Sequence, residues 1–238
     1  MLQGKVVDGD GHIIEPPQLW HQYLEAQYKD RAIRMEKDQA GVEYLVIDGQ
    51  PSARLRGMGP ALGGNGRDYE KLCKTGNFGY FDGPQGAYEP HARLRHLDNQ
   101  GIDAAVLFPS LGLAWESEVK DAKLAAAYAR AYNNWILDFT SVDRQRLIPM
   151  AIITLQDIDE GIKEVRRVAR LGAKGAFMRA APINQMPWWD RVYDPFWAVL
   201  EETGLPIGMH VATNDYFLGH QWKMAESVMT INSALHFY

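Results

Sequence analysis

The chain has 238 residues, of which 46% are hydrophobic and 23% charged, and its formal net charge is −5. This composition is ordinary for a globular enzyme, and the lack of a basic block in the sequence argues against binding along nucleic-acid phosphates. Cys73 is the only cysteine, which excludes a disulfide framework and a cysteine-ligated zinc site. We expect a cytoplasmic protein with no membrane partner, because the sequence shows neither an apolar signal core nor an apolar run of roughly 18 residues.

The first predicted strand covers residues 5–13 and ends in a polar pair. Four apolar residues bracket this pair and predict a buried strand: Val6, Val7, Ile13 and Ile14. Residues two apart on a strand point the same way, so Asp10 and His12 are expected to converge at its carboxyl end. A carboxylate beside an imidazole suits a divalent metal. The alternative is a strand-end turn in which Asp8 or Asp10 caps the following backbone.

A less regular segment follows. Residues 18–28 predict a short amphipathic helix, and residues 41–48 predict a hairpin strand. Glycine is frequent from residue 56 to 66 and again from 77 to 86. Long loops without a regular pattern are usually functional or partly disordered, so we expect a glycine-rich insertion at about 41–90 that borders the pocket.

From residue 92 onwards, predicted helices and strands alternate. The predicted strands are 104–109, 147–153, 175–179 and 206–211, and the predicted helices are 92–100, 122–143, 157–171, 195–203 and 223–238. Short apolar strands of this kind are typical of a parallel sheet buried on both faces. Polar residues at the strand ends favour an α/β fold of the TIM type, a (β/α)8-like barrel. A doubly wound open sheet is the alternative, which the lack of a glycine-rich phosphate turn disfavours.

Further candidate residues lie at or after strand ends. His210 ends the strand at 206–211, where it is either a third metal ligand or a buried, hydrogen-bonded histidine. Arg179 ends another strand and either clamps a substrate carboxylate or forms a structural ion pair. His220 follows in a loop that could line the site. Glu15 either reaches the mouth of the site or starts the helix behind Pro16-Pro17. Packing is the expected role of three tryptophans: Trp20, Trp188 and Trp189.

Four stretches carry a resemblance to a known family. They are Asp8-Gly-Asp10-Gly-His12-Ile-Ile-Glu15-Pro16, the segment from Arg93 to Val106, Tyr193-Asp194-Pro195-Phe196-Trp197, and the segment from Gly204 to Val211. On these residues the chain resembles the amidohydrolase superfamily, in its amidohydrolase-related, aminocarboxymuconate-semialdehyde-decarboxylase-like branch. The resemblance implies a distorted (β/α)8 barrel with one catalytic divalent metal, usually zinc. It also implies that Asp10, His12 and His210 are metal ligands.

The sequence departs from this family at two points. Asp10 stands where the usual first-strand pattern has histidine, although a carboxylate also occurs there among aromatic-acid decarboxylases. A carboxylate ligand lowers the positive charge of the site and makes manganese an alternative to zinc. The family's aspartate at the end of strand eight has no counterpart here. We therefore expect residues 1–238 to form a single incomplete barrel domain, with about five of the eight βα units.

Three functions are compatible with these residues. The first is metal-dependent hydrolysis, in which activated water attacks a carbonyl of a small organic substrate. The alternative is non-oxidative decarboxylation of a small aromatic or unsaturated acid. The third is an inactive truncated fragment that acts only through association. We expect His210, Arg179 and His220 to be catalytic, the partner to be a small-molecule substrate, and the protein to be a homo-oligomer.

Overall fold

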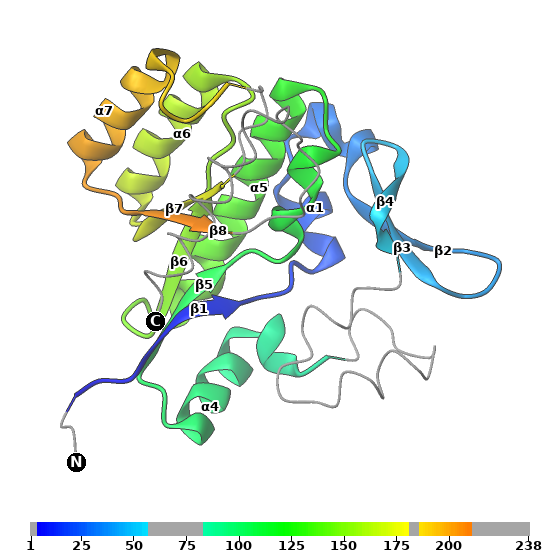
Figure 1. Ribbon diagram of the computed structural model, residues 1–238. Helices are drawn as coiled ribbons and strands as arrows, with labels where there is room; N and C mark the ends of the chain where they lie inside the picture. The colour runs from blue at the N-terminus through cyan, green and yellow to red at the C-terminus, as the bar shows by residue number, and fades with distance from the viewer. Residues whose placement is uncertain (1–3, 57–82, 181–185, 211–238) are drawn as a thin grey trace.

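The computed structural model describes residues 4–56, 83–180 and 186–210, and its main element is a curved parallel sheet (Figure 1). The sheet has the order β1-β5-β6-β7-β8. Its strands are β1 (Val7–His12), β5 (Ala104–Phe108), β6 (Leu147–Ile152), β7 (Gly175–Arg179) and β8 (Ile207–His210). All four neighbouring pairs are parallel. This topology confirms the prediction of a partial TIM-type barrel.

The helices connect successive strands as the alternating pattern predicts. They are α1 (Pro17–Tyr23), α4 (Pro90–Gln100), α5 (Ala122–Phe139), α6 (Ile158–Leu171) and α7 (Asp194–Thr203). Helices α5, α6 and α7 lie side by side along the sheet (Figure 1). Gly101, Gly172 and Gly204 end three of the helices in left-handed conformations, as expected of C-cap glycines. The predicted helix at 223–238 lies outside the described residues.

Short 3-10 helices complete the connections. They are η1 (Ala26–Arg31), η2 (Gln85–Ala87), η3 (Leu111–Leu113), η4 (Trp115–Ser117), η5 (Thr140–Val142) and η6 (Arg191–Tyr193). Two observed α-helices are shorter than predicted, because extended backbone or a 3-10 helix takes the place of their last turns. The helix predicted at 18–28 ends where Leu24 becomes extended. The helix predicted at 122–143 ends at Phe139 and continues as η5. Among the described residues, no helix is both long enough and apolar enough to cross a membrane.

The burial of the first strand was predicted wrongly in part. Ile13 and Ile14 are buried as expected, but Val6 is 53% exposed and Val7 is 52% exposed. The reason is the position of β1, which forms one edge of the described sheet and pairs with β5. The central strands β5, β6 and β7 are buried almost throughout, as their apolar sequences predict.

A second, antiparallel sheet precedes α4 in the sequence. It consists of β2 (Arg34–Lys37), β3 (Glu43–Ile47) and β4 (Gln50–Arg56). β3 confirms the hairpin strand predicted at 41–48, whereas β2 and β4 were not predicted. Arg31 ties this sheet to the barrel, donating to Asp48 Oδ1 at 2.6 Å and to Asp121 Oδ2 at 2.8 Å. Residues 57–82, which include most of the predicted glycine-rich insertion, lie outside the described residues.

Candidate metal centre

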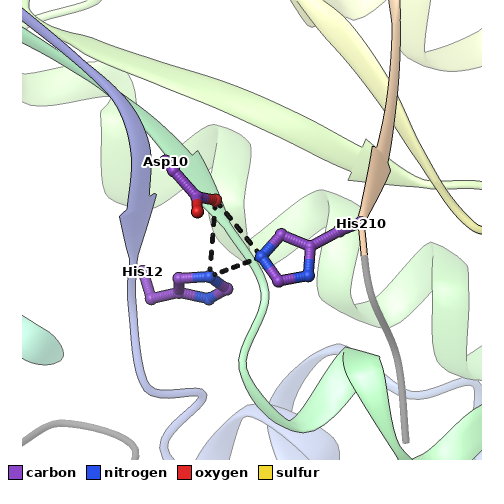
Figure 2. Close-up of side chains that lie close together, drawn as sticks. All are labelled: Asp10, His12 and His210. Carbon is purple, nitrogen blue, oxygen red and sulfur yellow. Dashed lines mark hydrogen bonds and ion pairs between the residues drawn. The ribbon is translucent and has the colours of Figure 1, made fainter. Parts of the chain in front are cut away.

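Three side chains converge at the carboxyl ends of β1 and β8. The Nε2 atoms of His12 and His210 lie 3.1 Å apart. Asp10 Oδ1 lies 3.2 Å from His210 Nε2 and 3.6 Å from His12 Nε2. Figure 2 shows the carboxylate and the two imidazoles pointing toward one another. Asp10 and His12 project to the same side of β1, as the alternation of a strand predicts.

These ligand atoms come from the two opposite edges of the sheet. β1 is the first strand in the sheet order and β8 the last. His12 and His210 can touch only because the sheet curls and brings its edges toward each other, as in a barrel. The Phe108 ring lies between these edges, with its centroid 6.1 Å from that of His12 and 5.5 Å from that of His210. The two imidazoles therefore lie close to the Phe108 ring at the carboxyl end of β5.

The orientation of His12 is fixed by a backbone carbonyl. His12 Nδ1 lies 3.1 Å from the Pro109 carbonyl oxygen. A carbonyl can only accept a hydrogen bond, so the proton of a neutral His12 must be on Nδ1. The lone pair is then on Nε2, which faces Asp10 and His210. Metal-ligating histidines are usually held in this way by an acceptor on the other ring nitrogen.

The separations between these atoms suit one divalent metal. Ligands about 2.05 Å from a tetrahedral zinc are about 3.3 Å from one another. Neighbouring ligands of an octahedral ion at about 2.1 Å are about 3.0 Å apart. The three separations here, 3.1, 3.2 and 3.6 Å, lie on both sides of the tetrahedral value and above the octahedral one. One carboxylate and two imidazoles can therefore share a divalent ion and leave positions open for water or substrate, as catalytic metal sites do.

The charge of Asp10 suits a ligand. The neighbouring His12 and His210 imidazoles hold the pKa of Asp10 well below its usual range. The carboxylate is therefore ionised near neutral pH and supplies one negative charge. Side-chain exposure also differs, because Asp10 is half exposed whereas both imidazoles are mostly buried.

Gly11, between the two first-strand residues, has no room for a side chain. A Cβ at Gly11 would lie 2.8 Å from Asp8 Oδ2 and 2.9 Å from both Arg93 Nη2 and the Val106 carbonyl oxygen. The buried Arg93 side chain donates from Nη1 to the His12 carbonyl oxygen at 2.9 Å. Asp8 lies outside the converging group and accepts from the Asp10 backbone N–H at 3.1 Å. Arg93 was not predicted, because a bond from a side chain to a distant backbone leaves no pattern in the sequence.

Glu15 has a position that neither prediction anticipated. It is fully buried and neither starts α1 nor faces the converging group. Its carboxylate accepts hydrogen bonds from the consecutive backbone N–H groups of Ser110, Leu111 and Gly112, at 3.3, 2.9 and 3.0 Å. Glu15 therefore ties the segment that follows β1 to the turn that follows β5.

Arg179 and His210 are register partners on β7 and β8. Arg179 is buried, and its positive charge lowers the pKa of the buried Glu116 carboxyl, although burial raises that pKa overall. Thr154 also hydrogen-bonds to Glu116. This environment supports the ion-pair interpretation of Arg179. His220 lies outside the described residues. Trp20 and Trp188 are buried packing residues as predicted, whereas the prediction for Trp189 was wrong, because it is 57% exposed and does not belong to the buried core.

Parallel βα units with a carboxylate and two histidines at the strand ends are typical of barrel proteins that bind a catalytic divalent metal. The chain belongs to the amidohydrolase family, whose sequence profile matches residues 7–235. This match confirms the family resemblance.

Individual relatives include decarboxylases. Gamma-resorcylate decarboxylase from Rhizobium radiobacter is 28% identical over 143 residues, which cover 56% of this chain and 43% of that enzyme. The matched region is thus less than half the length of this curated relative.

Solved structures show the same barrel fold. An amidohydrolase from Mycobacterium avium subsp. paratuberculosis has a TM-score of 0.73 and 24% identity, with 100% of this chain and 70% of that chain covered. A dihydroxybenzoic acid decarboxylase from Polaromonas, with bound manganese and 2-nitroresorcinol, has a TM-score of 0.56 and 17% identity. That alignment covers 99% of this chain and 60% of the decarboxylase.

Proposed function

We propose that this chain carries the metal centre of a divalent-metal-dependent carboxy-lyase that acts on a small aromatic carboxylic acid. The observation that carries the proposal is the convergence of Asp10 Oδ1, His12 Nε2 and His210 Nε2 within 4.8 Å of one another. These three side chains would hold the metal. Its chemistry there would be to bind the substrate carboxylate together with a neighbouring oxygen.

Decarboxylation has better support than hydrolysis, which the sequence alone placed first. The curated match is to a gamma-resorcylate decarboxylase. The ligand set of one carboxylate and two histidines does not by itself separate the two reactions, because hydrolytic zinc sites use the same kind of set. Hydrolysis remains the second candidate, supported by the family match.

The reaction replaces a carboxylate on a ring carbon with a proton and releases carbon dioxide. His12 contributes by presenting Nε2 in the orientation that Pro109 fixes. Arg179 and His220 stay candidate catalytic residues. The register pairing of Arg179 with His210 supports a place near the substrate, whereas its burial beside Glu116 supports a role in shaping the site.

Two metals are candidates for this centre. Zinc is the ion expected from the family resemblance and suits two histidines with one carboxylate. Manganese is supported by the carboxylate in the first ligand position and by the manganese bound in the Polaromonas decarboxylase. The small-molecule substrate, a homo-oligomeric state and a cytoplasmic location stay predictions.

The test is turnover of a panel of hydroxybenzoates, gamma-resorcylate included, by the Mn2+-loaded and the Zn2+-loaded chain. We expect release of carbon dioxide and formation of the corresponding phenol. The His210→Ala variant should lose this activity, whereas the His21→Ala variant, altered on an exposed residue of α1, should keep it. Turnover of esters or lactones alone would reject decarboxylation in favour of hydrolysis.

A further inference from the structure

We propose that Glu15 is a positioning residue, which holds the turn at 109–112 so that the Pro109 carbonyl selects the ligand tautomer of His12. The inference rests on the proposed metal centre, because metal binding is what requires this tautomer of His12. The contacts themselves involve only residues of this chain, so the tautomer can be measured in the metal-free protein.

The first observation is the way in which Glu15 is bound. The carboxylate is fully buried and accepts three hydrogen bonds from consecutive backbone N–H groups, those of residues 110, 111 and 112. Burial raises the pKa of Glu15, and these N–H donors oppose that rise by stabilising the carboxylate. Three donors on one carboxylate fix the turn directly after Pro109.

The second observation is the compactness of that turn. A Cβ at Gly112 would lie 2.6 Å from both Pro109 Cβ and Ile152 Cδ1. The backbone of Gly112 therefore lies directly against the Pro109 ring. Because side chains leave no free space there, a shift of residues 110–112 has to move Pro109 as well.

The third observation is that residues 12–15 and residues 108–112 are joined by hydrogen bonds at three successive points. His12 Nδ1 meets the Pro109 carbonyl oxygen at 3.1 Å. The Ile13 backbone N–H donates to the Phe108 carbonyl at 3.2 Å. Glu15 binds the N–H groups of residues 110–112. Glu15 therefore joins the segment that follows β1 to the backbone on the carboxyl side of Pro109.

Replacing the carboxylate with an amide should release this turn. A glutamine at position 15 has a single acceptor oxygen, and its NH2 group would face backbone N–H donors in a site without water access. The Pro109 carbonyl would then no longer be kept at hydrogen-bond distance from His12 Nδ1. His12 could take the other tautomer, with the proton on Nε2, in which it cannot bind a metal through that atom.

The experiment compares wild type, Glu15→Gln and Glu164→Gln. Glu164 is the matched control, because it is also a buried glutamate in a hydrogen-bond network, with Asn133 and Arg167. The His12 tautomer is read from long-range 1H–15N NMR spectra of the metal-free proteins at alkaline pH. The Mn2+ dissociation constant is measured by calorimetric titration.

We expect the Nδ1–H tautomer of His12 in wild type and in Glu164→Gln, and a mixture in Glu15→Gln. We also expect the Mn2+ dissociation constant of Glu15→Gln to rise about 10-fold or more, the usual effect of losing an outer partner of a ligand. A folded Glu15→Gln variant with the wild-type tautomer and dissociation constant would overturn the inference. If that variant does not fold, Glu15→Asp decides by the same two readouts.

The inference and the proposed function can fail separately. A wild-type protein that binds no Mn2+ or Zn2+ would reject the metal centre, while the tautomer would still test Glu15. A wild-type protein with His12 mainly in the Nε2–H tautomer would overturn the role of Glu15 even if no variant folds.

Discussion

The Nε2 atoms of His12 and His210 lie 3.1 Å apart, although their strands form opposite edges of the five-stranded sheet in the described part of the chain. The residues are 198 positions apart in the sequence. An ion bound by both imidazoles would therefore join the two edges of the curved sheet. The candidate metal centre is at the same time a candidate crosslink of the fold.

The stability of the protein should consequently depend on metal. At a Mn2+ concentration a hundred times the dissociation constant, binding to the folded state adds about 2.7 kcal/mol. For a chain of this size, that corresponds to a rise in Tm of about 5–10 °C. Differential scanning calorimetry with Mn2+ and with a chelator measures the difference. His12→Ala should abolish the rise and His21→Ala should preserve it, whereas an equal rise in both variants would place the ion elsewhere.

A methyl group at position 11 should be poorly tolerated. In Gly11→Ala the new Cβ would lie within 3.0 Å of Asp8, Arg93 and the Val106 carbonyl oxygen, and all three are held by hydrogen bonds or strand pairing. We expect a loss of about 1–3 kcal/mol in the free energy of unfolding, as for other overpacked sites. Urea denaturation measures it. Gly4→Ala is the control, since no atom lies within 4 Å of its added Cβ. Equal stability of the two variants would contradict the described packing.

Arg93 should matter more than its neighbour Arg95 on the same helix. Arg93 is buried and donates to the His12 carbonyl, whereas Arg95 is exposed and makes an ion pair with Glu89 at 3.8 Å. Arg93→Met should lower the free energy of unfolding by about 1–3 kcal/mol because the part-buried His12 carbonyl loses its donor. Arg95→Met should change it by less than about 1 kcal/mol. Urea denaturation and Mn2+ titration of both variants check this prediction. Equal decreases in the free energy of unfolding would show that the contact between Arg93 and His12 does not stabilise the protein.

The Arg31–Asp121 contact should make stability depend on pH. Hydrogen bonding to Arg31 lowers the pKa of Asp121 below the ordinary value of 3.8. A carboxyl whose folded pKa is lowered stabilises the protein above its unfolded pKa, and this contribution is lost as the pH falls through the folded pKa. Asp121→Asn keeps the helix cap but removes the charge, so it should be less stable than wild type at pH 7. The difference should shrink below about pH 4. A difference that is constant with pH would contradict a role for the charge.

The converging residues could be predicted because they follow simple rules. Asp10 and His12 lie two residues apart on β1, and His210 ends the partly buried strand β8 of the same sheet. Parallel strands bring their carboxyl ends to one side of a barrel. Together these rules place three residues from distant parts of the sequence close to one point.

The surrounding residues could not be predicted in the same way. The contacts of Arg93 and Glu15 are made to backbone groups about 80 and 95 residues away, and these contacts depend on the course of the turns. The exposure of Val6 and Val7 follows from the edge position of β1, which a single strand sequence does not reveal. Strands β2 and β4 are rich in charged and polar residues and lack the apolar pattern that identifies β3.

The most direct test of the metal centre is elemental analysis of the purified chain after loading with Mn2+ or Zn2+ and desalting. Asp10, His12 and His210 predict an equimolar amount of metal in the wild-type protein. In His210→Ala this metal should be lost, while His21→Ala should retain it. A wild-type protein without bound metal, or His210→Ala with undiminished metal, would contradict the assignment of these three residues as ligands.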